Sequence, residues 1–502
     1  MNMNRCKCAV LVAVMTCLSL TLCNAQAQVA DAVHPVRVLA AIKFNKLGRP
    51  IPTSYMGLSM EWPLVEKLFT GHDGRQATMI RLLRLFSRYN GAPLLRIGGN
   101  SQDEAAYDLP QNHGLPKFVH VNITDKMLRL LAKVFAATRC RYVIGLNLGD
   151  NRPDGAVKLV RACRRIIGNS NIAAYEIGNE PDFFHRFGGI WRHNTFALYL
   201  KRWQRYYKAI RPYLADGRQI EGPAFGGGWL RDVPKFIRLE HRELAIISLH
   251  RYPLGATVKN PRSPVFCSIA NLLKNSSASS FARLMLPALA AAKPYQLPVR
   301  YGEMNSAWNG GKQGVSNTFA STLWGVDTLF EIASVGGAGV NIHLSEGFDQ
   351  FPGNYDPVYF HPGQPLHMRP LFYGMLLFAR TIQDHARLIP VTYHTSINVK
   401  IWAARAANGI VRIAVINKSR RTALITMNLP TGRAWHGYSL TAPAITSVHG
   451  LKFDALSFGS DGSRLPHHAT RPGRNRRWQK NNGLIARPYS ISEVVLPLRG
   501  NK

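Results

Sequence analysis

Acidic residues are scarce in this chain of 502 residues, in which 28 Asp and Glu stand against 63 Lys and Arg, a formal net charge of +35. Such a field concentrates polyanions near the surface, so nucleic acid, anionic lipid and acidic polysaccharide are the candidate partners. General solubility is the alternative explanation, because charge alone names no partner. The sequence has no helix-turn-helix, RNA-recognition or finger motif, so we expect no nucleic-acid partner.

Cysteine is also rare. After the first 27 residues only Cys140, Cys163 and Cys267 remain, an odd and sparse set that makes no disulfide framework. We expect each to be a small buried hydrophobe, with a single bridge as the alternative. Because no C-x-x-C pair and no clustered His and Cys spacing occurs, we predict neither a structural zinc nor another metal or cofactor.

Long apolar runs are absent beyond the N-terminus. The chain begins with a basic stretch, an apolar run over 9–22, and small residues at Ala25 and Ala27 with the spacing of a cleavage site. This pattern predicts a signal peptide over residues 1–27 and a secreted or periplasmic protein. A membrane anchor is the disfavoured alternative, because the run is shorter than the roughly 20 residues that a span needs. We therefore predict no transmembrane span.

Between about residue 50 and residue 345, short apolar runs that end in polar or Gly residues alternate with segments of helical period. This alternation indicates βα units and a parallel sheet. Eight such runs predict a (β/α)8 barrel: SYMGLSMEW, APLLRIGGNSQD, YVIGLNLGD, IAAYEIGNEP, IEGPAFGGG, LAIISLHRYPL, LPVRYGEMNS and GAGVNIHLSEG. No Gly-rich phosphate fingerprint follows the first run, which argues against a dinucleotide-binding fold.

Beyond the barrel the pattern changes to alternating apolar and polar residues. The runs SINVKIWAAR, IVRIAVINK, TALITMNLP and SISEVVLPL are typical of β-sandwich strands. The earlier run VHPVRVLAAIKF has no crossover helix of its own, so we expect it to join the sandwich. The predicted fold class is therefore α/β, with an N-terminal strand in 28–50, a barrel over 51–385 and a C-terminal sandwich over 386–502.

Polar side chains follow the predicted barrel strands, whose carboxyl ends converge on one pocket in such a fold. Glu180 ends the fourth strand and Glu303 ends the seventh, so we expect them to face each other across the barrel mouth. Two carboxylates in one pocket suit glycoside hydrolysis, in which one protonates the departing oxygen while the other attacks the anomeric carbon or activates water. A solvated or salt-bridged carboxylate is the alternative for either residue alone.

Four motifs in this region, LLRIGGNSQD, NEP, SLHRYPL and GEMNSAWNGG, occur in an order that resembles one known barrel family. The similarity is to glycoside hydrolase family 79, which contains heparanase and the exo-acting β-glucuronidases, and it runs from about Met56 to the sandwich. The resemblance implies that Glu180 is the general acid/base and Glu303 the nucleophile of a retaining mechanism. That mechanism needs the two carboxyl groups about 5 Å apart.

The resemblance also implies supporting residues around the nucleophile. Arg96 would keep Glu303 ionised and aimed, since a nearby cation lowers a carboxylate pKa. Tyr252 would donate to Glu303, with plain packing as its alternative. His250 would support the site, with a structural hydrogen bond as its alternative.

Substrate contacts form a third group implied by the resemblance. Asn179 would hold the sugar 2-hydroxyl, and Glu61 and Asn100 match positions that bind sugar hydroxyls, with loop bracing as their alternative. Family members read the uronate carboxylate with loops after strands seven and eight, and the matching residues here are Gly353, Asn354, Tyr355 and Trp308. Trp308 departs from the tyrosine expected at its position, and an indole N–H cannot reproduce a hydroxyl.

The predicted function is that of a secreted retaining exo-β-glucuronidase that releases terminal glucuronic acid from glycans or glycoconjugates, so the expected partner is a uronic-acid-containing carbohydrate. One alternative is an endo-acting, heparanase-like enzyme whose basic surface guides an acidic polysaccharide. A second, of another class, is a non-catalytic polyanion-binding protein that merely retains the barrel. The presence of both glutamates disfavours this last alternative.

Overall fold

The computed structural model describes residues 34–70, 74–109, 119–185, 191, 193–215, 217–345, 352–361, 365–430, 435–454, 456–457, 467–468 and 483–497. The signal peptide predicted for residues 1–27 lies outside these ranges. Within them, every helix is too short or too polar to cross a membrane.

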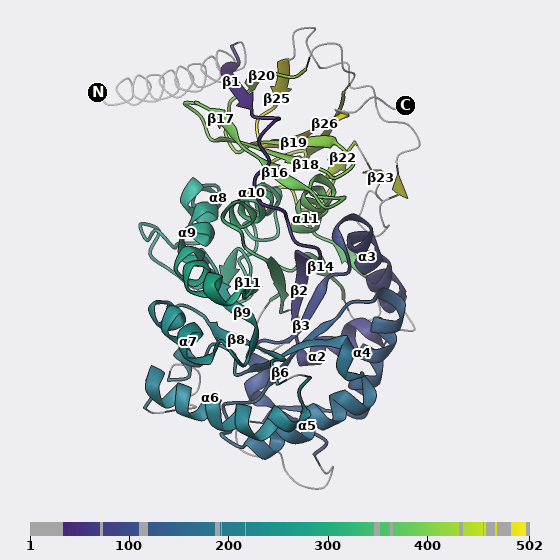
Figure 1. The fold of residues 1–502 in the computed structure, drawn as a ribbon. Helices are drawn as coiled ribbons and strands as arrows, with labels where there is room; N and C mark the ends of the chain where they lie inside the picture. Colours follow the sequence, from purple (N-terminus) through teal and green to yellow (C-terminus); the bar gives the residue numbers. More distant parts are fainter. Residues whose placement is uncertain are drawn as a thin grey trace, which may run out of the picture.

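Eight parallel strands close into a barrel, with helices arranged around it (Figure 1). In order around the barrel the strands are β11 (Val299–Met304), β13 (Gly339–Leu344), β2 (Met56–Glu61), β3 (Leu94–Gly98), β6 (Tyr142–Leu146), β7 (Ile172–Ile177), β8 (Ile220–Phe225) and β9 (Leu244–Arg251). They coincide with the eight predicted runs, so the barrel prediction is confirmed. β2 and β13, the first and the last barrel strands along the chain, pair directly and so close the barrel, with His343 of β13 opposite Ser59 of β2.

Helices between the strands begin and end at residues suited to those positions. The Thr124 side chain accepts from the Met127 amide at the start of α4, and Thr195 caps α6 in the same way. Gly336 ends α10 in the left-handed conformation, with φ of 97°. The main helices are α2 (Trp62–Phe69), α3 (Arg75–Asn90), α4 (Asp125–Thr138), α5 (Pro153–Ile166), α6 (Phe196–Ile210), α7 (Val233–Glu240), α8 (Ile269–Leu272), α9 (Asn275–Ala292), α10 (Phe319–Val335) and α11 (Pro370–Thr381).

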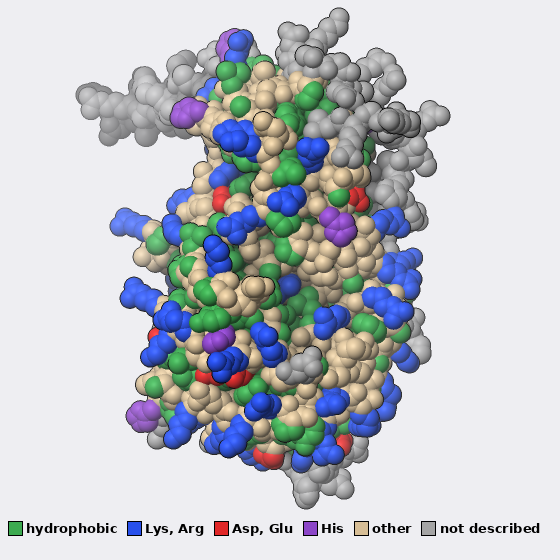
Figure 2. Space-filling model, viewed as in Figure 1, with side chains coloured by type: hydrophobic (Ala, Val, Ile, Leu, Met, Phe, Trp, Pro, Cys, Tyr) green, Lys and Arg blue, Asp and Glu red, His purple; other side chains and the backbone are tan. Residues whose placement is uncertain are grey.

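The helices carry the excess positive charge outward. Figure 2 shows Lys and Arg side chains spread over this face of the molecule, with few Asp or Glu among them. Among the described residues, the most exposed acidic residues are Asp108, Asp154, Asp384 and Asp454. The surface is therefore more one-sidedly basic than the composition alone indicates, because many of the scarce acidic residues lie inside.

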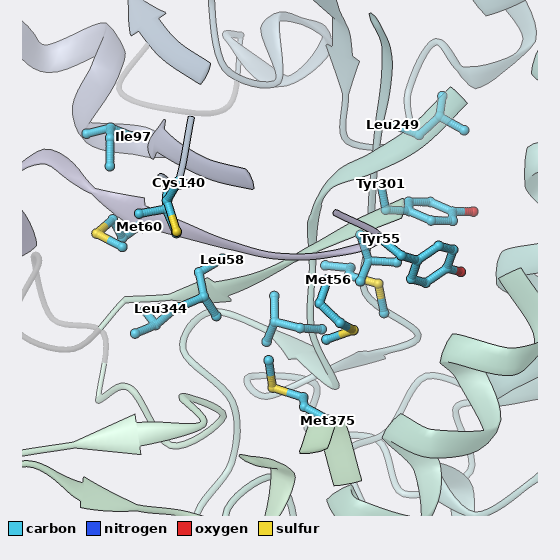
Figure 3. Close-up of a cluster of buried hydrophobic side chains, with 14 of the residues drawn as sticks. Tyr55, Met56, Leu58, Met60, Ile97, Cys140, Leu249, Tyr301, Leu344 and Met375 are labelled. Atoms are coloured by element: carbon cyan, nitrogen blue, oxygen red, sulfur yellow. The ribbon is translucent and has the colours of Figure 1, made fainter. Parts of the chain in front are cut away.

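Hydrophobic side chains from strands and helices pack into one core around the barrel wall. Figure 3 shows part of it, where Leu58 of β2, Leu344 of β13 and Met375 of α11 belong to one cluster. The three described cysteines are buried and free, which agrees with their prediction as small hydrophobes: Cys140, Cys163 and Cys267.

The C-terminal region forms two sheets that pack on each other around a second core. The N-terminal strand β1 (Val36–Ile42) lies in the smaller sheet between β17 (Val391–Tyr393) and β20 (Ala423–Met427), which confirms that it joins the sandwich. The smaller sheet also contains β25 (Gly483–Ala486). The larger one contains β16 (Arg387–Ile389), β18 (Val399–Arg405), β19 (Ile410–Asn417), β26 (Ser490–Pro497), β21 (His436–Thr441), β22 (Lys452–Phe453), β23 (Leu456–Ser457) and β24 (His467–His468).

A buried ion pair joins the sandwich to the barrel. Lys418, after β19, lies 2.7 Å from Asp327 of α10, and both side chains are almost completely shielded from solvent. The indole of Trp402 on β18 donates to the same carboxylate at 3.2 Å. Removing one partner of such a pair would leave an uncompensated buried charge, so these contacts fix how the sandwich sits on α10.

Candidate active site

Two glutamates face each other at the carboxyl end of the barrel. Glu180 follows β7 and Glu303 lies on β11, and one carboxylate oxygen of each lies within 4.8 Å of the other. Retaining glycosidases hold their two carboxyl groups at about 5 to 5.5 Å, whereas inverting enzymes need about 6.5 to 9.5 Å to admit a water molecule. The observed spacing matches the retaining geometry.

The Glu303 carboxylate is surrounded by donors. Arg96 of β3 donates to one oxygen at 2.8 Å, and the Tyr252 hydroxyl donates to the other at 2.7 Å. Burial acts to raise the pKa of Glu303, but the positive charges of His343 and Arg96 and the Tyr252 hydrogen bond outweigh burial and hold the pKa well below its usual range. Glu303 is therefore ionised near neutral pH, as a nucleophile must be.

The surroundings of Glu180 have the opposite effect. Burial, the Glu303 carboxylate and Asp182 all raise the pKa of Glu180 well above its usual value. The Nδ1 atom of His250 lies 3.2 Å from Glu180, and burial lowers the pKa of His250 to about 4, so this imidazole is neutral near neutral pH. Glu180 thus holds a proton that it can donate. Two carboxyl groups whose pKa values are pushed apart divide the roles of acid and nucleophile between them.

The glycine-rich turn after β8 leaves room for Glu180. A Cβ atom on Gly226 would lie 2.6 Å from the Glu180 carboxyl carbon, so a larger residue there would displace the acid. The turn is held by Asp182, whose oxygens accept from the amides of Gly226, Gly227 and Gly228 at 3.1, 3.0 and 2.6 Å. The glycines that follow the fifth barrel strand therefore leave space for Glu180, which follows the fourth strand.

Asn179 and Asn100 lie beside the pair of glutamates and contact each other. The side-chain Nδ2 of Asn179 donates to the Oδ1 of Asn100 at 3.1 Å. The Oδ1 of Asn179 accepts from Arg96 at 2.8 Å. Glu61 is 1% exposed, and its two oxygens accept from the backbone amides of Asn100 and Ser101 at 3.2 and 2.8 Å. Glu61 thus braces the loop that carries Asn100.

The loops after strands seven and eight meet at the Asn354 side chain, which donates to the Gly311 carbonyl at 3.3 Å. Tyr355 is 3% exposed, and its ring stacks on that of Tyr252 at 5.9 Å between centroids. Trp308 lies on the short strand β12 (Ala307–Trp308), where its indole covers Gly255 of β10 (Leu254–Gly255).

Gly353 is the fourth residue predicted to bind the uronate. Its carbonyl accepts from the Arg369 guanidinium, and its φ of 54° is in the left-handed region. Of these four residues, Tyr355 is connected to the nucleophile through Tyr252, because the two rings stack and the Tyr252 hydroxyl donates to Glu303.

Two residues of the site were missed in the sequence. Glu176 of β7 binds the Arg96 guanidinium through Nε at 3.0 Å and Nη2 at 2.5 Å, and His343 of β13 lies 3.7 Å from Glu303. Each is the second-to-last residue of its strand and lies outside the four motifs that marked the site. The available signal was alternation, because His343 and Asn341 are polar at every second position of the run GVNIHL, which marks a face turned into the barrel.

A metal ion would compete with an existing cation in this pocket. Glu180, His250 and Glu303 are close enough together to share one. Arg96 already supplies a positive charge 2.8 Å from Glu303, however, and would repel a second cation. Hydrolysis by two carboxylates needs no metal.

Comparison with known proteins gives two curated relatives and no matching family model. The chain is 27% identical over 367 residues to a β-glucuronidase of Neurospora crassa, which covers 64% of this chain and 62% of that protein. It is 25% identical over 427 residues to a β-glucuronidase of Aspergillus niger, which covers 73% and 75%. The chain thus spans less than two thirds of the first relative. Both support the predicted resemblance to a family that contains β-glucuronidases.

Solved structures show the same fold. A 4-O-α-L-rhamnosyl-β-D-glucuronidase from Fusarium oxysporum 12S matches 92% of this chain and all of its own, with a TM-score of 0.71 and 18% identity. A family 51 arabinofuranosidase from Xanthomonas axonopodis pv. citri matches the same share with a TM-score of 0.64 and 14% identity. At these identities the comparison establishes the architecture alone.

Proposed function

We propose that this chain is a retaining β-glycosidase that releases terminal glucuronic acid from glucuronides. The observation that carries the proposal is the pair Glu180 and Glu303, whose oxygens lie within 4.8 Å and whose pKa values are shifted in opposite directions. The curated relatives named β-glucuronidase support the choice of sugar.

In the first step Glu303 attacks the anomeric carbon while Glu180 donates its proton to the leaving oxygen, so the glycosidic bond breaks and an ester to Glu303 forms. Burial and the charge of Glu303 together raised the pKa of Glu180, and because the ester carries no charge, the repulsion from Glu303 disappears and this pKa falls. Glu180 is then an effective base for the second step, in which it takes a proton from the water that hydrolyses the ester. One pair of residues thereby supplies the acid and, half a cycle later, the base.

Recognition of an acidic sugar is supported by the loops beside the pocket and by the surface. Tyr355 lies against Tyr252, which itself contacts the nucleophile, so its hydroxyl is near enough to the first sugar to take part in binding. The excess of exposed Lys and Arg attracts an anionic substrate before it binds (Figure 2). This charge also favours a second candidate, endo-acting cleavage of an acidic polysaccharide, because a long chain would contact more of the basic surface.

The proposal is tested with a panel of aryl β-glycosides comprising the glucuronide, glucoside, galactoside and xyloside, together with an aryl α-L-arabinofuranoside and an acidic polysaccharide. We expect the glucuronide to be the best substrate and the β anomer to be the first product seen by proton NMR. Cleavage of the polysaccharide alone would favour the endo-acting candidate. The α anomer as first product would refute the retaining mechanism, and inactivity on every substrate would refute the enzymatic proposal.

A further inference from the structure

His343 lies between the strand that carries the nucleophile and the strand that carries Glu61. Its Nδ1 atom is 2.9 Å from the Ser59 hydroxyl and 3.7 Å from a Glu303 oxygen, and its Nε2 atom is 3.4 Å from a Glu61 oxygen. The side chain is 3% exposed, and its ring meets Tyr355 edge to face at 6.1 Å. Each ring nitrogen thus lies close to an oxygen atom that can accept a hydrogen bond.

These contacts close a ring of polar interactions around the pocket. From Glu303 the ring passes through Arg96 at 2.8 Å to Asn179 at 2.8 Å and on to Asn100 at 3.1 Å. The Asn100 amide donates to Glu61 at 3.2 Å, and His343 links Glu61 back to Glu303. The ring therefore joins the nucleophile to both asparagines that are placed to hold the sugar.

We propose that His343 is a positioning residue, a buried imidazolium that closes this ring and supplies positive charge to the nucleophile. The inference rests on the proposed function, since it assigns His343 a part in the same reaction. Its action is indirect, because it forms no bond to the substrate and acts on the Glu303 carboxylate through its charge, from 3.7 Å.

The charges around His343 favour the imidazolium. Burial acts to lower the pKa of His343, and Arg96 of β3 acts in the same direction, but Glu303 of β11 and Glu61 of β2 outweigh both and raise it. Ser59 of β2 accepts from Arg96 at 2.9 Å and has a second lone pair for the His343 Nδ1–H.

The remaining groups that face this region do not alter the balance. His250 of β9 is neutral near neutral pH and lies 4.0 Å from the Glu303 oxygen that faces His343. Glu180 after β7 is protonated in the resting site, and Tyr355 stays neutral because burial raises its pKa. Two cations, Arg96 and His343, thus act on Glu303.

A cation at this position has different effects on the two steps. It stabilises the Glu303 carboxylate before attack, and it stabilises the same carboxylate as the leaving group when the ester is hydrolysed. No proton moves to or from His343 in either step, so the residue contributes charge and orientation only. Its loss should raise the pKa of Glu303 and slow hydrolysis of the intermediate.

The first test needs no turnover. Histidine labelled at Cε1 would be titrated by NMR in the wild-type protein, and the resonance absent from the variant His343→Gln would be assigned to His343. We expect it to titrate above the ordinary histidine value of about 6.5, and its pKa to fall by about 1 to 3 units in the variant Glu303→Gln. A pKa of His343 at or below the ordinary value, unchanged in the variant Glu303→Gln, would overturn the proposal.

The second test is the pH dependence of kcat/KM for the best aryl glycoside. Gln retains a donor and an acceptor but no charge, so His343→Gln should fold and should move the acid limb upward by about 1 to 3 pH units. The matched control is His241→Gln, on the loop after α7, where the imidazole stacks on Tyr295 at 3.8 Å far from any residue of the site. The control should leave the limb unchanged.

The two tests separate this inference from the proposed function. If the NMR titration behaves as expected but no glycoside is cleaved, the proposed function fails while the charge on His343 and its coupling to Glu303 stand. If glycosides are cleaved and the acid limb of His343→Gln coincides with that of wild type, His343 is merely structural and the inference fails. A fall in melting temperature without a shift of the limb leads to the same conclusion.

Discussion

Replacing Glu180 by Gln should make the protein more stable at neutral pH while it removes the general acid. Two ionised carboxylates with oxygens within 4.8 Å of each other repel each other by at least about 3 kcal/mol at an effective dielectric constant of about 20. Glu180 avoids this repulsion by staying protonated. In the unfolded chain, where its pKa is about 4.3, holding that proton at pH 7 would cost about 3.7 kcal/mol.

The two figures agree, so Glu180→Gln should raise the free energy of unfolding by about 2 to 4 kcal/mol at pH 7.5. The folded-state pKa of Glu180 is raised. Its contribution to stability is therefore complete below the unfolded-state pKa and is lost as the pH rises toward the folded-state value. The advantage of the variant should accordingly shrink to less than about 1 kcal/mol near pH 4.5 and disappear at lower pH, where the carboxyl is protonated in both states.

Glu303→Gln should have the opposite effect, since the folded-state pKa of Glu303 is lowered and its charge accepts hydrogen bonds from Arg96 and Tyr252. Weakening these charged hydrogen bonds should cost about 1 to 3 kcal/mol at pH 7.5 and less in acid. Thermal unfolding at pH 4.5, 6 and 7.5 measures both effects. Glu66→Gln is the matched control, because Glu66 is 41% exposed in a surface pair with Lys126. A variant Glu180→Gln no more stable than wild type at pH 7.5 would refute this account of the acid.

Three further predictions concern the chemistry and the substrate. With an activated aryl glycoside, Glu180→Ala should accumulate glycosyl-enzyme and recover turnover in azide, whereas Glu303→Ala should lose the covalent route; a β-azide product from Glu303→Ala would reverse the two roles. The wild type should prefer β-glucuronide to β-glucoside by at least about 30-fold in kcat/KM, because two donors left unsatisfied cost about 1 to 3 kcal/mol each. Tyr355→Phe should reduce this preference without abolishing turnover, and equal wild-type rates would mean that Trp308 marks another specificity. Added salt should lower kcat/KM on a polymeric uronide more than on an aryl glycoside, and equal sensitivity would count against steering by the basic surface.

The larger elements of the fold could be predicted because each leaves a pattern in the sequence. A buried parallel strand is a short apolar run, and each of the eight barrel strands has a polar or Gly residue at its carboxyl end or directly after it. Strands of two residues, such as β10 and β12, have no periodicity to detect, so the pairing that sets Trp308 against Gly255 was not predictable. The contact decides where the indole lies, and it depends on two loops about 50 residues apart in the chain.

The residues of the site could be predicted where a sequence motif contains them, but not where their role depends on contacts with residues far away in the sequence. Glu180 and Glu303 belong to the motifs NEP and GEMNSAWNGG, whereas Glu176 and His343 lie outside these motifs, in the largely apolar strands IAAYEI and GVNIHL. Glu61 also stood at a predicted strand end. Its hydrogen bonds could not be predicted, because the backbone amides that donate to it lie some 40 residues later in the sequence. Sequence patterns thus located the carboxylates, while the network that sets their pKa values required the structure.

Arg96 explains how a buried pocket can hold three carboxylates at once. Its guanidinium binds Glu176 through Nε and Nη2, Glu303 and Ser59 through Nη1, and Asn179 through Nη2. A planar fork with five N–H donors can serve two carboxylates in fixed directions, which a lysine ammonium cannot do. Because Glu303 accepts from this cation, it remains ionised, whereas Glu180, which has no hydrogen bond from Arg96 among the described contacts, is the carboxyl that keeps a proton. The division between acid and nucleophile therefore follows from which carboxylates one arginine can reach.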